Sequence, residues 1–243
     1  MVNIFENEQQ VAEAIVKEMM AGLTVAHPVF CLASGNTPAK GYDLFSKVPN
    51  IEGIIQKLKI VSLDEWVGIE RENKGSCYEM LANDLFSKVH LSPEQIIFYD
   101  GMSAHLDEEC QRIDDFIAKN PITFSLMGVG MNGHIGLNEP GFPLLSHSSV
   151  VPLADKTKEV AQKYFDEKTP LEQGITLGLK QIINSKRVIV VITGAHKAEI
   201  VKDIFTSETT TLPAQALLGY DHIDFYLDKA AAQYLDKERG RLV

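Results

Sequence analysis

Short apolar runs alternate with amphipathic stretches along the whole chain. The apolar runs predict buried strands at Val29–Ala33, Ile60–Leu63, Ile96–Tyr99, Thr123–Met127, Val188–Thr193 and Ile223–Leu227. Helical spacing of hydrophobic positions predicts helices over residues 7–22, 38–47, 76–88, 104–119, 155–166, 196–205 and a C-terminal stretch from Lys229. Strands that alternate with helices indicate βαβ units. We therefore expect one α/β domain over residues 1–243, Rossmann-like, with a mostly parallel sheet flanked by helices.

Composition narrows the class of protein. The net charge of −10 at pH 7 argues against a broad nucleic-acid surface, which needs clustered Lys and Arg, although a few local cations can still hold one phosphate. Cys31, Cys77 and Cys110 lack CxxC spacing, so we expect reduced thiols in a cytoplasmic protein and no zinc site. No apolar run reaches the roughly 18 residues that a membrane span needs, so no membrane partner is expected.

The residues that follow each strand deserve inspection, because ligands of such sheets bind beyond the carboxyl ends of the strands. In "VFCLASGNTPAKGYDLF" a buried strand runs into Ser34, Gly35, Asn36 and Thr37, and Pro38 suits the first position of a helix. Small polar residues at a helix N-terminus form a site suited to phosphate. The alternative is a plain turn in which Thr37 caps the helix.

A second strand end, "IVSLDEWVGIE", places Asp64 and Glu65 beside the only tryptophan, Trp66. A carboxylate in this position is open to tuning of its pKa by partial burial. The alternative is an exposed acidic turn, which is the commoner case for a lone pair of carboxylates.

A third junction, "GVGMNGHIGLNEPG", has the glycine spacing of a dinucleotide-binding turn. That function needs a helix to begin at the third glycine, and Gly136, Pro140 and Gly141 would break it. We therefore interpret residues 128–141 as a glycine-rich loop that presents Asn132, His134 and Glu139 for acid–base chemistry. A structural histidine is the alternative.

The fourth junction, "VIVVITGAHKAEIVKDIF", puts Lys197 in the first turn of a predicted helix, where the helix dipole disfavours a cation unless an anion binds there. A solvated lysine is the alternative. Four strand ends on the same edge of one sheet thus supply an anion loop, a carboxylate, a His/Glu pair and a lysine. This set indicates a site for proton transfer on a phosphorylated metabolite.

These motifs carry a resemblance to a known family over nearly the whole chain. The segments "LASGNTP", "SLDEWVG", "GVGMNGHIGLNEPG" and "ITLGLKQIINSKRVIVVITGAHKA" resemble the glucosamine/galactosamine-6-phosphate isomerases (deaminases), which are related to 6-phosphogluconolactonases. Trp66 and "IGLNEP" point away from the lactonase branch. "DEWVG", the "GSC" at Gly75 to Cys77 and "ITLGLKQIINSKRV" look more like the galactosamine-6-phosphate branch.

The resemblance implies an aldose–ketose isomerisation in which a hexosamine 6-phosphate and water give a ketohexose 6-phosphate and ammonium, with no metal or organic cofactor. Asp64 matches the base that moves a proton between C2 and C1. His134 matches the ring-opening acid–base group, and Glu139 matches its carboxylate partner. The loop Ser34–Thr37 and Lys197 match the phosphate ligands.

Two positions depart from that pattern. Asn132 stands where some members have Asp; it can orient an imidazole or a hydroxyl but cannot take a proton. Lys163 is the nearest cation where glucosamine-specific members often carry Arg, and an ammonium lacks the bidentate fork of a guanidinium. Residues 142–178, which include Lys163, form a long insert between two strands that we expect to act as a lid over the sugar.

Two other functions fit parts of the pattern. A lactonase would share the fold and the phosphate loop but hydrolyse an ester. A sugar-phosphate sensor would keep the fold and lose the chemistry, which the joint presence of Asp64, His134 and Glu139 argues against. The expected partner is a small hexosamine phosphate, and the sequence does not define the oligomeric state.

Overall fold

The computed structural model describes residues 1–207 and 212–235 of the chain. Within them, seven strands form one sheet in the order β1-β10-β9-β6-β2-β3-β5, and every neighbouring pair is parallel. The strands are β1 Val2–Phe5, β2 Val29–Leu32, β3 Lys59–Ser62, β5 Ile96–Ile97, β6 Phe124–Gly128, β9 Val188–Ile192 and β10 Ile223–Asp228. The predicted parallel α/β sheet is therefore confirmed, with β1 as an additional edge strand.

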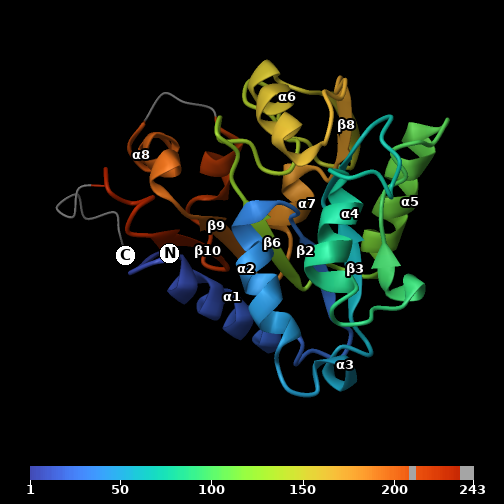
Figure 1. Cartoon of the computed structure of the whole chain (residues 1–243), viewed down its shortest axis with the longest axis horizontal. Helices are drawn as coiled ribbons and strands as arrows, with labels where there is room; N and C mark the ends of the chain where they lie inside the picture. Colours follow the sequence, from blue (N-terminus) through green and yellow to red (C-terminus); the bar gives the residue numbers. More distant parts are fainter. Residues whose placement is uncertain (208–211, 236–243) are drawn as a thin grey trace.

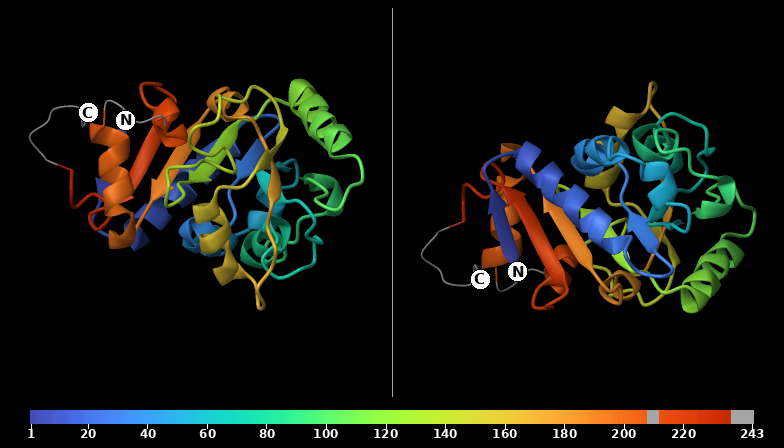
Figure 2. Two further views of the ribbon diagram at one scale, coloured as in Figure 1. Left: turned by 90° about the horizontal axis from the view of Figure 1, so that it is seen from above. Right: turned by 90° about the horizontal axis from the view of Figure 1, so that it is seen from below.

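Helices cover both faces of this sheet (Figures 1 and 2). The helices of the described residues are α1 Glu8–Gly22, α2 Asn36–Ser46, α3 Ile51–Ile54, α4 Cys77–Leu81, α5 Leu106–Lys119, α6 Asp155–Ala161, α7 Leu179–Ile183 and α8 Ala198–Thr206. Shorter turns of helix are η1 Ala82–Phe86, η2 Pro93–Gln95, η3 Gln162–Tyr164, η4 Ala195–Lys197 and η5 Pro213–Leu217. Alternate side chains of the strands point to opposite faces, so α1, α2 and α4 share one apolar cluster and α5, α7 and α8 share the other.

A second, antiparallel sheet carries part of the predicted chemistry. It consists of β4 Asp64–Trp66, β8 Gln173–Thr176 and β7 Ser149–Pro152, with β8 in the middle. Asp64 pairs with Thr176, so β4 is held by a strand more than a hundred positions away in the sequence. In Figure 1 this sheet and α6 lie at the top of the molecule, beyond one end of the parallel sheet.

The order of the strands creates a switch point between β2 and β6. The chain runs from β2 outward to β3 and β5, and then crosses back so that β6 lies on the other side of β2. Crossovers leave in opposite directions from such a point, which opens a crevice at the carboxyl ends of the two strands. The loops after β2 and β6 are those that hold Ser34–Thr37 and residues 128–141.

Several local predictions are wrong. The C-terminal stretch from Lys229 forms separate turns as far as Leu235, because the Asp228 carboxylate accepts the Ala231 N–H (2.8 Å) and turns the chain sharply; the rest of that stretch lies outside the described residues. Thr37 is not the cap of α2, which begins at Asn36 after Gly35. Lys197 precedes α8 and lies in the short helix η4.

Across the described ranges, no helix is long and apolar enough to cross a membrane.

Candidate active site

A cavity of about 290 Å³ opens at the switch point. Nine of the ten predicted site residues line it: Ser34, Gly35, Asn36, Thr37, Asp64, Asn132, His134, Lys163 and Lys197. The tenth, Glu139, does not line the cavity itself, but its carboxylate contacts Asn132 and His134, which do. Segments from both halves of the chain therefore meet around one space large enough for a small metabolite.

The loop after β2 presents uncapped backbone N–H groups at the cavity. The backbone of Gly35 has φ of 88° and leads directly into α2, whose first N–H groups have no side-chain cap. A Cβ at position 35 would approach within 3.0 Å of the Tyr164 hydroxyl, so a glycine serves both the conformation and the close approach. Unsatisfied N–H groups and the helix dipole together favour negative charge at this point.

Lys197 adds a buried cation to the same cavity. Its side chain is 9% exposed, and its Nζ donates to the Val129 carbonyl oxygen at 2.6 Å. No carboxylate of the described residues lies within ion-pair distance of it. Burial, with a further contribution from the charge of Lys163, lowers the pKa of Lys197 to about 8. A buried ammonium that faces another cation is stabilised when an anion arrives.

The same cavity is lined by a buried carboxylate, Asp64, for which the described residues supply no ion pair. Asp64 is 8% exposed, and burial raises its pKa to about 6, against the opposing effects of a hydrogen bond from Cys77 and the charge of His134. A carboxyl group with this pKa is ionised near neutral pH and still accepts a proton readily, which suits a general base.

Glu65 and Ser62 fix the backbone around this carboxylate. Glu65 accepts hydrogen bonds from the N–H groups of Trp66 (2.8 Å), Cys77 (2.9 Å) and Tyr78 (3.0 Å), which ties β4 to the start of α4. Burial raises the pKa of Glu65 to about 7 despite these three donors. The Ser62 hydroxyl donates to the Asp64 carbonyl oxygen (3.1 Å). Asp64 is thus held from two sides.

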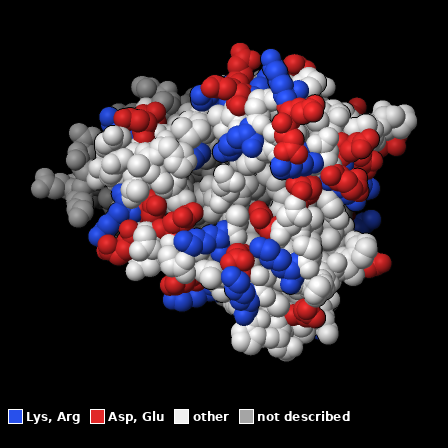
Figure 3. Space-filling view, in the orientation of Figure 1, with Lys and Arg blue, Asp and Glu red and all other residues white. Residues whose placement is uncertain are grey.

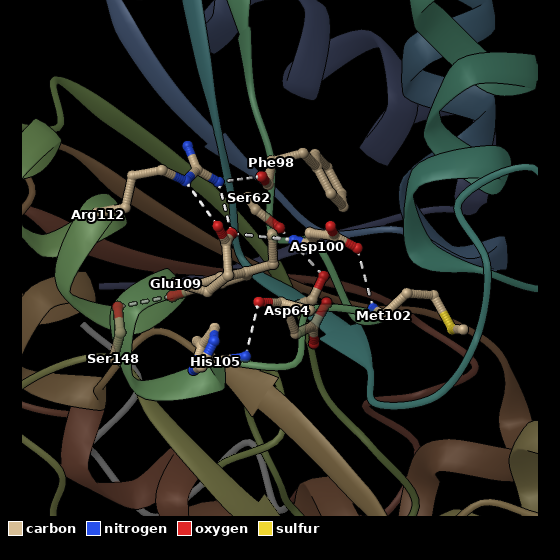
Figure 4. A network of polar contacts seen from close by, with 11 residues as sticks. Ser62, Asp64, Phe98, Asp100, Met102, His105, Glu109, Arg112 and Ser148 are labelled. Atoms are coloured by element: carbon tan, nitrogen blue, oxygen red, sulfur yellow. Dashed lines mark hydrogen bonds and ion pairs between the residues drawn. The ribbon is translucent and has the colours of Figure 1, made fainter.

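Figure 4 shows the polar contacts that continue from this region to α5. The Arg112 guanidinium donates to the Glu109 carboxylate and to the Phe98 carbonyl oxygen, and Glu109 accepts the Asp100 N–H at 3.1 Å. Asp100 in turn accepts the Met102 N–H at 3.0 Å. These bonds fix the segment that follows β5. The Gly101 carbonyl oxygen of this segment accepts the N–H of Gly68, which lies just after β4.

The imidazole of His134 has partners for one ring nitrogen only. Its Nδ1 lies 3.1 Å from the Thr157 hydroxyl and 3.5 Å from Oε2 of Glu139. No contact to Nε2 occurs within the described part of the chain, and His134 lines the cavity. A carboxylate at Nδ1 selects the tautomer with the proton there, which leaves Nε2 as the acceptor.

Glu139 differs from Asp64 because it has partners on every side. Asn132 Nδ2 donates to Oε2 at 2.9 Å, and the Ala154 N–H donates to Oε1 at 3.3 Å. Burial acts against ionisation of Glu139, but bonds from His134, Thr157 and Asn132 and the charge of His134 lower its pKa to about 2. Glu139 is therefore a permanent anion, and Asn132 acts as its donor.

Gly130 explains part of the glycine spacing in the loop. A Cβ at this position would lie 2.2 to 2.4 Å from the ring atoms of His134, so only glycine lets the imidazole lie against the backbone. The G-x-G-x-x-G pattern here makes room for a side chain of the same loop.

Sequence analysis missed Thr157, Cys77 and Tyr164, which also line the cavity. Thr157 contacts His134, Cys77 contacts Asp64, and Tyr164 faces Gly35. No sequence pattern sets Thr157 or Tyr164 apart from other polar residues of an amphipathic segment. For Cys77 the one signal was its place after "GS" near the Asp64 strand.

Charges elsewhere do not define a second site of the same kind. Figure 3 shows acidic and basic side chains interspersed on the visible face, without a broad patch of one sign. Among residues 1–207 and 212–235, no group of three or more His, Cys, Asp or Glu side chains could hold a metal ion.

Comparison with known proteins identifies the family that has this fold. A family model described as glucosamine-6-phosphate isomerases/6-phosphogluconolactonase matches residues 6–224. A glucosamine-6-phosphate deaminase of Bacillus cereus (strain G9842) is 30% identical over 228 residues, which are 93% of this chain and 84% of that protein. The solved structure of a monomeric glucosamine-6-phosphate deaminase superposes with a TM-score of 0.89 at 26% identity, covering 96% of this chain and 98% of the other.

More distant structures share the fold alone. The 6-phosphogluconolactonase from Leishmania guyanensis has a TM-score of 0.76 at 18% identity, over 97% of this chain and 98% of its own. The fold is an α/β fold whose cavity is lined by the uncapped start of α2, by Lys197, and by Asp64 and His134. The chain belongs to the family of glucosamine-6-phosphate isomerases and 6-phosphogluconolactonases.

Proposed function

We propose that this protein is a hexosamine-6-phosphate isomerase that deaminates its substrate: a 2-amino-2-deoxyhexose 6-phosphate and water give a ketohexose 6-phosphate and ammonium. The observation that carries the proposal is one cavity lined by a buried cation, Lys197, and a buried carboxylate, Asp64, neither of which has an ion-pair partner among the described residues. A sugar with a phosphate and an ammonium group complements both charges.

The phosphate binds at the N-terminus of α2. Backbone N–H groups and hydroxyls of Ser34–Thr37 surround it, Lys197 supplies a buried charge, and the exposed Lys163 adds a second cation. Fixing this group keeps C1 and C2 of the sugar beside Asp64 and His134, which line the same cavity. The tether supplies the entropic part of catalysis, because the reacting carbons stay beside their acid–base groups.

Ring opening is the task of His134. Its Nε2 takes the proton of the C1 hydroxyl and returns a proton to the ring oxygen, so the aldehyde forms as the C1–O bond to the ring breaks. Glu139 stabilises the imidazolium that exists between these two transfers, and Asn132 and Thr157 hold the pair in place. Positioned proton transfer of this type contributes roughly 10²–10⁴-fold.

Asp64 then moves a proton from C2 to C1 of the open chain. Removal from C2, with one proton passing from the ammonium group to O1, gives an enolamine, and delivery of the same proton by Asp64 to C1 leaves a protonated imine at C2. Water adds to the imine, and ammonium departs to leave the ketone. Because Asp64 makes both transfers, its carboxylate oxygens must come within about 3 Å of C1 and of C2.

The lactonase is the second candidate function, and the family includes it. Its substrate carries no ammonium group to offset the charge of Asp64, which favours the amino sugar. Incubation with glucosamine-6-phosphate, galactosamine-6-phosphate and 6-phosphogluconolactone, with ammonia and acid measured, decides between them. Ammonia from either amino sugar supports the proposal. Acid from the lactone alone identifies a lactonase, and no product from any of them identifies a sensor.

The preferred epimer follows from the same assay. We propose galactosamine-6-phosphate as the better substrate, on the resemblance carried by "DEWVG" and Gly75–Cys77; the curated relatives carry the name of the glucosamine enzyme. The two sugars differ at the C4 hydroxyl alone. A ratio of kcat/KM above one for glucosamine-6-phosphate over galactosamine-6-phosphate would reverse this assignment.

Residues 142–178 are proposed to close over the bound sugar. The segment contains β7, α6, η3 and β8, and it supplies Ala154, Thr157, Lys163 and Tyr164 to the surroundings of the cavity. Limited proteolysis with and without a hexitol 6-phosphate tests the closure. Cleavage within this segment should slow when the ligand is present, and an unchanged rate would rule out the lid.

A further inference from the structure

Thr157 contacts the imidazole of His134 from a different segment of the chain. It lies in the first turn of α6, its side chain is 5% exposed, and it lines the cavity. Its Oγ1 is 3.1 Å from Nδ1 of His134, and Oε2 of Glu139 is 3.5 Å from the same nitrogen. An N–H···O hydrogen bond normally spans about 2.7–3.2 Å, so the hydroxyl is the hydrogen-bond partner and Glu139 contributes chiefly its charge.

The glycine-rich loop fixes the plane of this imidazole but not the order of its nitrogens. The ring lies against Gly130, where no Cβ would fit. The His134 N–H donates to Asn132 Oδ1 at 3.3 Å, and the His134 carbonyl oxygen accepts the Gly130 N–H at 3.0 Å. A half-turn of the ring about Cβ–Cγ would keep its shape and exchange each nitrogen with a carbon. A partner at Nδ1 is what distinguishes the two orientations.

The start of α6 is held close to the His134 and Glu139 pair. The Ala154 N–H, just before α6, donates to Oε1 of Glu139 at 3.3 Å. The preceding Leu153 N–H donates to the Glu172 carbonyl oxygen at 3.0 Å, which ties this segment to the residue before β8. Thr157 follows within one turn of helix, so these contacts hold its hydroxyl at the imidazole.

We propose that Thr157 is a positioning residue of the reaction: its hydroxyl oxygen accepts the Nδ1–H of His134 and thereby keeps Nε2 unprotonated and turned toward the sugar. This inference rests on the proposed function, in which Nε2 takes the proton of the C1 hydroxyl. The tautomer of a histidine is set by the hydrogen bond that its other nitrogen makes. Glu139 then stabilises the imidazolium by its charge.

Kinetics of three variants give the first test. Thr157→Val keeps the size of the side chain and removes the hydroxyl, so kcat should fall roughly tenfold, as expected for one hydrogen bond to a charged group. KM should stay nearly unchanged, because the phosphate loop is untouched. Thr157→Ser should restore most of the activity. Thr169→Val is the matched control in the same segment, since that hydroxyl donates to the Glu167 carbonyl oxygen (3.0 Å), and it should have wild-type kinetics.

The tautomer of His134 separates positioning from a merely structural role. In protein labelled with ¹⁵N-histidine, the His134 signals are assigned by their loss in His134→Gln. At about pH 8.5, above the ordinary titration range of histidine, the wild type should carry its proton on Nδ1 and show Nε2 as a bare nitrogen. In Thr157→Val a measurable share of the proton should move to Nε2, and Thr157→Ser should reverse this change.

Two results would overturn the positioning role while the enzyme remains a deaminase. One is a Thr157→Val variant with wild-type kcat. The other is a loss of kcat in Thr157→Val with the proton still on Nδ1, because the hydroxyl would then not determine the tautomer.

A measurement on the wild type covers the case in which the variants fail to fold. The Nδ1–H proton of His134 should show a nuclear Overhauser contact with the methyl group of Thr157. A bare Nδ1, or an Nδ1–H without this contact, would overturn the inference. The NMR measurements need no substrate, so they decide the Thr157 contact independently of turnover. Absence of ammonia release by the wild type from both amino sugars would instead overturn the proposed function.

Discussion

Two carboxylates beside the same cavity have pKa values shifted in opposite directions. Burial raises the pKa of Asp64 to about 6, whereas Glu139 is held near 2 although its side chain is only 2% exposed. The difference lies in the partners: Glu139 is surrounded by an imidazole, an amide and a hydroxyl, and Asp64 has a thiol. A pair of acids whose surroundings separate their pKa values can divide the roles of base and permanent anion.

Lys197 belongs with Asp64 in this comparison. Its pKa is lowered to about 8 by burial, so it too carries a charge that the described residues leave unpaired. The buried charges of Asp64 and Lys197 thus lower the stability of the protein until a ligand neutralises them. The charge of Glu139, in contrast, has partners within the protein. Substitutions at these positions should therefore separate activity from stability in a predictable way.

The largest effect is expected for Asp64→Asn. Loss of the base should lower kcat by roughly 10²–10⁴-fold and abolish exchange of the C2 proton with solvent, while a hexitol 6-phosphate still binds. The same change should stabilise the fold, because a carboxyl group whose folded pKa is raised destabilises the native state increasingly as pH rises from its ordinary value of 3.8, and fully once pH exceeds about 6. The gain at pH 8 should be on the order of 3 kcal/mol and vanish below about pH 4.

Isotope exchange followed by NMR and thermal unfolding at several pH values measure both effects. Asp84→Asn, in η1, is a control for a second partly buried carboxyl group with a raised pKa. Substantial turnover in Asp64→Asn would assign the base elsewhere, and an unchanged melting temperature at pH 8 would mean that Asp64 is not an unpaired buried charge.

The next effect is expected for Lys197→Met. A hydrogen bond to a charged group is worth about 1.5–3 kcal/mol, so KM should rise about 10–100-fold with a smaller change in kcat. The folded protein should become more stable at pH 7, since the buried ammonium is lost. This gain should shrink between about pH 8 and 10.5, where the wild-type lysine loses its proton. Lys202→Met, exposed on α8, serves as the control; equal KM values for both variants would remove Lys197 from the phosphate site.

Glu139→Gln tests the paired carboxylate. The loss should be roughly tenfold when the substrate enters as the closed ring, because the imidazolium loses its anionic partner. Stability should fall here, in contrast to Asp64→Asn. A carboxyl group whose folded pKa is lowered stabilises the protein above about pH 4.5, and this contribution is lost as pH falls toward 2. Acid unfolding curves measured for both proteins check the sign; a more stable Glu139→Gln at pH 7 would contradict the comparison.

Sequence patterns predicted the residues at strand ends better than the contacts among them. Ser34–Thr37 and His134 could be found because a strand of a parallel sheet delivers whatever follows it to one edge. The strand β4 could not be found in the sequence, because its three residues have no apolar pattern of their own. They form a strand by pairing with β8, which lies in a distant segment of the chain. Thr157 could not be found for the same reason, since its importance lies in a contact with His134 that only the folded chain creates. The roles assigned to these side chains stay predictions until the variants are measured.

The smallest effect concerns Lys163, which is exposed and lies over the Tyr164 ring at 4.8 Å. An exposed ion pair is worth about 0–1 kcal/mol, so Lys163→Met should raise KM by no more than roughly fivefold and leave stability unchanged. Lys163→Arg should lower KM, because a guanidinium can bind two phosphate oxygens at once where an ammonium acts as a point charge. Lys168→Met, exposed in the same segment, is the control. If Lys163→Met weakened binding as much as Lys197→Met, exposure would not be what separates the two lysines, and the cavity would close over Lys163 when the ligand binds.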